Sequence, residues 1–99
     1  MNKDFKDLDP LLHSQLRLSI ISILIGAKDA EFTYIREKTG ATSGNVSVQV
    51  SKLEEAGYLT VKKEFKNNYP CTTLSITQNG IKAFEDYVNN LKTYITIKK

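Results

Sequence analysis

The sequence contains very little cysteine and histidine, and it has no tryptophan. Its 99 residues include one cysteine, Cys71, and one histidine, His13. A single cysteine excludes a disulfide within the chain, and no neighbouring residue favours Cys71 as a redox sensor. One cysteine and one histidine cannot supply a zinc-ligand pattern, so we predict no metal site and no cofactor. We expect His13 to have a structural or surface role.

Long apolar runs are also absent. The longest, from Ile20 to Ala27, is interrupted by Ser22 and is far too short to span a bilayer. The first residues show no charged segment followed by an apolar stretch and a small-residue cleavage site. We therefore expect a cytoplasmic protein that has no membrane partner.

Patterns typical of enzymes are missing as well. The acid pairs Glu54-Glu55 and Glu85-Asp86 are consecutive, so their members do not face one another on a helix. No nucleophile–base set and no Gly-rich phosphate loop stands out, and we predict no catalytic residues. The net charge of +3 is a mild basic bias that does not by itself identify a partner.

What the sequence does contain is a succession of helix and strand signals within one domain, residues 1–99. The expected helices cover about 10–27, 34–39, 43–56 and 79–97. Their expected N-caps are Asp9, Thr33, Thr42 or Ser43, and Thr77 or Asn79. Gly40 and Gly57 are expected to end the second and third helices. A brief strand is expected at 30–32.

After Gly57 the apolar period changes from helical to two, which predicts two strands within about 59–77. The loop between them is expected at 66–70, where Asn67 and Asn68 tolerate left-handed conformations. The resulting order is helix, strand, helix, helix, strand, strand, helix. It predicts a winged helix-turn-helix, a mainly α domain with a small β-hairpin wing (α+β).

The helix expected at 43–56 has an unusual composition. Val46, Val50 and Leu53 fall on one face and form a buried stripe. The other face carries small polar side chains, although glutamate, lysine or alanine would give a more stable helix. Asparagine and glutamine can pair with adenine edges, valine can contact a thymine methyl, and a helix N-terminus suits a phosphate. The pattern predicts a recognition helix in the major groove; the alternative is a solvated helix that is rich in serine.

The predicted DNA-binding residues lie on this helix, the helix before it and the wing. They are Thr33, Ser43, Gly44, Asn45, Ser47, Val48, Gln49, Lys52, Lys62, Lys63, Lys66, Asn67 and Asn68.

The two ends of the sequence share a different pattern. Apolar residues of the last helix recur at spacings of three and four, as in an a/d seam, and the N-terminal segment repeats that spacing. Packing on the core leaves Leu91, Tyr94 and Ile95 with nothing obvious to cover. We therefore predict that residues 1–12 and the helix 79–97 form a homodimer interface. Its predicted residues are Phe5, Leu8, Leu12, Ile81, Phe84, Tyr87, Val88, Leu91, Tyr94 and Ile95.

Several segments, taken in order, resemble the small winged-helix transcriptional regulators related to the MarR and ArsR groups. They are residues 8–14 with 16–18, 32–36, 43–47, 52–59 and 70–73, followed by Thr77 and Gly80. The resemblance covers about 8–91. It implies a homodimeric regulator of transcription whose third helix enters the major groove and whose wing lies on the backbone or minor groove. Two such helices about 34 Å apart would bind an inverted repeat in double-stranded DNA.

The wing departs from the pattern of these relatives, which carry glycine and arginine around the wing proline. Here Asn67, Asn68, Tyr69 and Cys71 occupy those positions. The arginine-poor wing and the nearly balanced charge favour a second interpretation, an interaction or assembly module that has the fold but does not read DNA. The sequence identifies no small-molecule effector.

Overall fold

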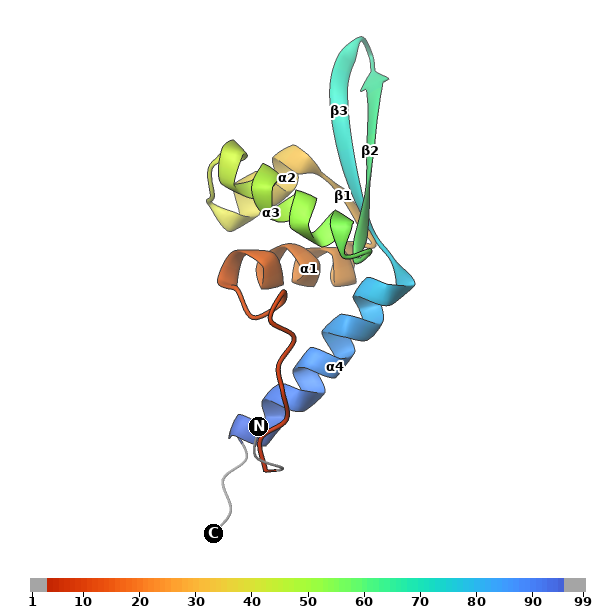
Figure 1. Cartoon of the computed structure of the whole chain (residues 1–99). Coiled ribbons are helices and arrows are strands. Elements are labelled where there is room, and N and C mark those ends of the chain that lie inside the picture. Colours follow the sequence, from red (N-terminus) through yellow and green to blue (C-terminus); the bar gives the residue numbers. More distant parts are fainter. Residues whose placement is uncertain (1–3, 96–99) are drawn as a thin grey trace.

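The computed structural model describes residues 4–95 as four helices and three strands (Figure 1). The elements, in chain order, are α1 (Gln15–Ala27), β1 (Asp29–Glu31), α2 (Phe32–Thr39), α3 (Ser43–Glu55), β2 (Leu59–Lys66), β3 (Tyr69–Ile76) and α4 (Gln78–Ile95). This order confirms the predicted winged helix-turn-helix. Residues 1–3 and 96–99, which hold the outer ends of the two predicted interface segments, lie outside the described residues.

The three strands form one antiparallel sheet in the order β1-β3-β2. β2 and β3 make the wing, and their last pair is Lys66 with Tyr69. The turn between them contains only Asn67 and Asn68, at φ values of 53° and 67°. Two consecutive left-handed residues are typical of the two-residue hairpin turn that matches the twist of the strands. The turn is therefore shorter than the loop predicted at 66–70, and β3 begins before Pro70.

The core lies where α1, α2 and α3 meet the base of the sheet. Its buried residues are Leu12, Ile20, Ile21, Leu24, Ile35, Val46, Val50, Leu53, Leu59, Leu74 and Tyr87. The predicted stripe of α3 is part of this core. One face of α3 is therefore packed in the core, and the opposite face is exposed to solvent.

Two predicted helix starts were wrong. The first helix begins at Gln15 rather than at Pro10, and Ser14 is its N-cap. The Asp9 carboxylate instead closes a separate turn, where Oδ1 accepts from the Leu11 amide at 2.8 Å. The second helix begins at Phe32 directly after β1 and has no side-chain cap, because the sheet already fixes the preceding backbone. Thr33 lies inside its first turn.

The other helix boundaries agree with the predictions. Thr42 caps α3 by accepting from the Asn45 amide, and Thr77 accepts from the Gly80 amide at the start of α4. Gly40 and Gly57 adopt left-handed conformations, with φ values of 72° and 81°. Because glycine adopts this conformation at little cost, both positions end their helices where the sequence indicated.

The molecule is elongated, with principal extents of 59 × 25 × 21 Å. We call residues 15–76 the head, and residues 4–11 together with α4 the arm. Figure 1 shows the wing projecting from one end of the head and α4 leaving the other, with the N-terminal segment running beside α4. Across residues 4–95, no helix combines the length and apolar character needed to cross a membrane.

Candidate nucleic-acid interface

The outward face of α3 is open to solvent. Its exposed residues include Ser43, Gly44, Asn45, Ser47, Val48 and Lys52, all of which the sequence predicted as DNA contacts. Val48 is 53% exposed although it is apolar and lies in the middle of the helix. Apart from Lys52, this surface offers short hydrogen-bonding side chains and one methyl-bearing side chain, Val48, to a groove.

The N-terminus of α3 opens at the same surface. Arg36, in the last turn of α2, donates from Nη1 to Ser43 Oγ at 3.4 Å. A guanidinium here adds positive charge where the helix dipole and the free amides already favour an anion. The sequence prediction omitted Arg36. The signal that could have found it is its place one turn before Gly40, because a short turn brings the end of α2 close to the start of α3.

Gln49 differs from the other predicted readers, because its side chain is half-buried and already hydrogen-bonded within the protein. Its Oε1 accepts from Nη1 of Arg17 on α1 at 2.5 Å, and its Nε2 donates to Asn45 Oδ1 at 3.1 Å. Arg17 was missed by the sequence analysis. It lies 32 residues before Gln49, and no spacing rule connects two residues on helices that meet only in the fold.

The wing carries cations and two exposed aromatic rings. Its predicted polar contacts, Lys62, Lys63, Lys66, Asn67 and Asn68, are all exposed. Phe65 is 76% exposed and Tyr69 is 74% exposed. The strand pattern placed Phe65 in an apolar series with Leu59 and Val61. The hairpin extends beyond the core, so nothing in the head covers the ring.

A groove of about 270 Å³ lies between α3 and the wing. It is lined by Phe32, Ser47, Val50, Ser51, Glu54, Val61, Lys63 and Thr72. Glu54 and Lys63 bring one charge of each sign to this groove. Lys62 is also partly neutralised, since its Nζ lies 3.6 Å from Glu64 Oε2. Thr33 is exposed but is absent from this lining, where its neighbour Phe32 is found.

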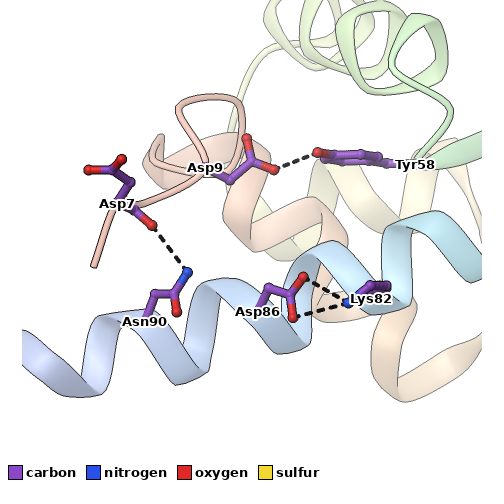
Figure 2. A network of polar contacts seen from close by, with 6 residues as sticks. All are labelled: Asp7, Asp9, Tyr58, Lys82, Asp86 and Asn90. Atoms are coloured by element: carbon purple, nitrogen blue, oxygen red, sulfur yellow. Dashed lines mark hydrogen bonds and ion pairs between the residues drawn. The ribbon is translucent and has the colours of Figure 1, made fainter. Parts of the chain in front are cut away.

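The apolar stripe of α4 divides into two edges. One edge contacts the N-terminal segment: the Phe5 and Tyr94 rings lie 5.3 Å apart, and the Tyr94 hydroxyl donates to the Lys6 carbonyl at 2.7 Å. Phe5 remains 41% exposed and Tyr94 37% exposed. Asn90 also donates to the Asp7 carbonyl at 3.1 Å (Figure 2). The other edge consists of Ile81, Val88 and Ile95, which are not among the residues that pack on the core. Ile81 is half-buried, whereas Val88 and Ile95 are exposed.

Two of the predicted interface residues are core residues of the single chain. Leu12 is 0% exposed and Tyr87 is 5% exposed. The Tyr87 hydroxyl lies 3.0 Å from His13 Nδ1, so the ring is anchored within its own chain. Neither side chain can face a second copy, and this part of the prediction is corrected. Phe84 and Leu91 are half-buried against the core, as is Leu8, whereas Ile95 is 67% exposed.

The junction between head and arm contains a short hydrogen bond. The Tyr58 hydroxyl donates to Asp9 Oδ2 at 2.5 Å, as Figure 2 shows. Burial, together with the hydrogen bond and the negative charge of Asp9, raises the pKa of Tyr58 to about 12. Nearby, Lys82 and Asp86 form an ion pair at 3.2 Å along α4. The N-terminal segment is therefore attached both to the head and to α4.

Cys71 has no sign of activation. Its thiol donates to Glu31 Oε1 at 2.9 Å, and this hydrogen bond, with burial, raises the pKa of Cys71. A raised pKa keeps the group as a thiol, whereas reactive cysteines need the thiolate. Within residues 4–95, no three His, Cys, Asp or Glu side chains gather in a way that could hold a metal ion.

Comparison with known proteins bears on this arrangement. The solved structure of a transcriptional regulator homologue from Pyrococcus horikoshii OT3 matches with a TM-score of 0.81 and 27% identity, over 86% of this chain and 84% of that one. A MarR-family transcriptional regulator from Rhodococcus sp. RHA1 matches with a TM-score of 0.71 at 14% identity, over 84% of this chain. This chain spans only 58% of that regulator, with which it shares the fold.

The sequence itself also matches known proteins. An uncharacterized protein of Methanocaldococcus jannaschii is 35% identical over 78 residues, which cover 79% of this chain and 85% of the relative. The model of one protein family, described as winged helix DNA-binding domain, matches residues 16–95, from α1 to the end of α4. The chain belongs to the winged helix DNA-binding domain family.

Proposed function

We propose that this protein is a sequence-specific regulator of transcription that binds double-stranded DNA as a homodimer. α3 enters the major groove, and the wing lies along the phosphate backbone. The protein acts by occupying its site and not by catalysis. The family and the regulators that share the fold support this proposal at the level of DNA binding.

The observation that carries the proposal is the contrast between the two faces of α3. Val46, Val50 and Leu53 fix the helix in the core, while its small polar side chains face solvent. A groove reader needs both properties, because the helix must be held rigidly and must not keep the DNA away with long side chains. The three exposed wing lysines lie beyond this surface and suit phosphates.

The homodimer is proposed from the second edge of α4, on which Val88 and Ile95 are exposed. Ile81, Val88 and Ile95 are seven residues apart and so lie on one line along the helix, and the N-terminal segment occupies the other edge. A second copy related by a two-fold axis would cover this line with its own. The two α3 helices would then meet half-sites about one turn of DNA, or roughly 34 Å, apart.

Selection from a random pool of duplex DNA, using the full chain at low salt, tests the proposal. We expect an inverted repeat to be enriched. Its affinity should fall by about three to five orders of magnitude between 50 and 200 mM salt if roughly six to ten phosphates are contacted. Lys66→Ala should weaken all sequences alike and flatten the salt slope by about one unit. Lys82→Ala on α4 is the charge-matched control. A pool without any enriched sequence would overturn the proposal.

A second candidate function is an interaction module that does not read DNA. Glu54 lines the groove between α3 and the wing, and Lys62 is paired with Glu64, which reduces the positive charge offered to phosphates. A protein partner would show a much shallower dependence on salt than DNA does. The same titration therefore separates the two candidates.

A further inference from the structure

A chain of hydrogen bonds runs from α1 to the exposed face of α3. Arg17 Nε donates to the Leu11 carbonyl at 2.6 Å, and Arg17 Nη1 donates to Gln49 Oε1 at 2.5 Å. Gln49 Nε2 then donates to Asn45 Oδ1 at 3.1 Å. Arg17 and Gln49 are half-buried, and Asn45 is exposed. This series of hydrogen bonds thus begins at the edge of the core and ends on the surface proposed to face DNA.

The guanidinium of Arg17 determines which group donates in each of these hydrogen bonds. The oxygen and the NH₂ group of a side-chain amide are similar in size and shape. Which of the two faces a neighbour is therefore assigned from the hydrogen-bonding partners. A guanidinium has only donors, so the atom of Gln49 that faces Arg17 must be the oxygen. The NH₂ group of Gln49 then faces Asn45, which must in turn present its own oxygen to Gln49. The NH₂ group of Asn45 is the end that remains free.

We infer that Arg17 is a positioning residue that sets base preference by turning the Asn45 amide so that its donor faces the DNA. The inference rests on the proposed role of α3 in the major groove. An asparagine free to use both ends pairs with adenine, accepting from N6 and donating to N7. With its oxygen turned towards Gln49, Asn45 presents its NH₂ group to the groove. Guanine offers two acceptors for that donor, N7 and O6, at the same edge.

Guanine is therefore the expected base opposite Asn45. The position is identified in the selected site as the one where Asn45→Ala removes base preference. At that base pair we expect the wild-type protein to favour guanine over adenine by about 5- to 150-fold, the range that a good base contact supports. This differs from the adenine contact expected from the residue types alone.

Replacing Arg17 tests the positioning role. Arg17→Met removes the donor and leaves the amides free to turn, so adenine should rise to near parity with guanine at this position. Arg17→Lys keeps a donor-only group and should retain the guanine preference, which makes it the conservative rescue. Lys82→Met, which removes one positive charge from α4, should leave the preference unchanged. Circular dichroism and the melting temperature serve to check that each variant is folded.

Reversing the direction of the hydrogen bond between residue 49 and Asn45 is a sharper test, because it predicts a new base preference rather than the loss of one. In Gln49→Glu the carboxylate accepts from Arg17 and can only accept from Asn45 as well. Asn45 must then turn its NH₂ group inward and expose its oxygen. We expect the preferred base to change from guanine to one with a donor at this edge, adenine or cytosine.

The outcomes separate the inference from the proposed function. A wild-type preference for adenine, or an Arg17→Met variant that loses affinity for every sequence equally while keeping its guanine preference, would overturn the role of Arg17 and leave DNA binding intact. If the wild-type protein enriches no sequence at all, the proposed function fails and the inference fails with it.

Discussion

The head and the arm are built in different ways. Apart from Leu12 and Tyr87, every buried apolar residue of the core belongs to the head. In the arm, α4 has 18 residues, of which only Gly80 and Tyr87 are buried. Its contacts with the N-terminal segment include hydrogen bonds from Asn90 and Tyr94 to main-chain carbonyls and the ring contact of Tyr94 with Phe5. The core of the head is formed within one copy, whereas the arm leaves Val88 and Ile95 exposed.

We expect the head to contribute mainly to folding stability and the arm mainly to assembly. Burial of apolar surface dominates folding stability, so the head carries most of the free energy of unfolding. The arm places its apolar line where a second chain could contact it. Substitutions in the head should therefore change folding, and substitutions along the outer edge of α4 should change assembly.

The largest expected effect is in the core of the head. Leu53→Ala removes a fully buried side chain and should lower the free energy of unfolding by about 2–5 kcal/mol, because a cavity remains. Val48→Ala, on the opposite face of the same helix, should change it by less than about 0.5 kcal/mol. Urea unfolding of both variants measures the contrast. Equal losses would show that the outward face of α3 is not free.

The next effect is on association. The sequence pattern suggested Leu91 and Ile95 as the positions to change, but Leu91 packs on the core, so Val88 and Ile95 are the better pair. Val88→Glu with Ile95→Glu should oppose pairing of two copies by several kcal/mol, because like charges would face each other. Sedimentation at micromolar concentration should give a dimer for the wild type and a folded monomer for the variant. Asn89→Glu, beside this line, is the control, and a monomeric wild type would contradict the proposed interface.

A smaller effect is expected at the junction of head and arm. A Cβ atom at Gly80 would overlap the Tyr58 carbonyl oxygen, so Gly80→Ala must displace the start of α4. We expect a loss of about 1–3 kcal/mol in the free energy of unfolding. Gly26→Ala in α1 meets no atom within 4 Å and should instead stabilise the protein by about 0.5–1 kcal/mol. Thermal unfolding of the two variants measures both changes in stability. If Gly80→Ala and Gly26→Ala changed the stability in the same direction, the expected overlap at Gly80 would be contradicted.

The smallest effect concerns pH. The pKa of Tyr58 is about 12 in the folded protein, above its ordinary value of 10.0, so its contribution to stability is complete below pH 10 and is lost as the pH rises towards 12. Tyr58→Phe removes the bond to Asp9 and should cost roughly 0.5–1.5 kcal/mol at pH 8. The difference in the free energy of unfolding between the wild type and Tyr58→Phe, measured with urea, should become smaller between pH 10 and 12. A difference that stayed constant would mean that Tyr58 does not titrate as the structure indicates.

Local signals in the sequence were enough to predict the order of elements and the buried face of α3. Val46, Val50 and Leu53 obey a simple period, and Gly40 and Gly57 have a conformation that few other residues adopt. These features depend on neighbours in the sequence. For the same reason most of the exposed residues on α3 were predicted, although Ser51, Glu54 and Glu55 are exposed as well.

The errors arose where a tertiary contact competes with a local one. Asp9 is a good helix cap by type, but its two carboxylate oxygens bond Leu11 and Tyr58 instead. Tyr87 has the spacing of an interface residue but reaches His13. Gln49 was predicted as a free reader because Arg17, which holds it, comes from another helix. No pattern within one segment contains this information.

The position of β3 in the sheet has a further consequence, for the behaviour of the protein at high concentration. β1 pairs only with residues 73–75 of β3, so residues 69–72 have a strand on one side alone, as does β2 over its full length. Open strand edges are templates for the growth of intermolecular sheets. Here Pro70 removes one backbone donor, and the lysines of β2 repel an identical edge. The hairpin can therefore project far into solvent without recruiting other copies of itself into a fibre.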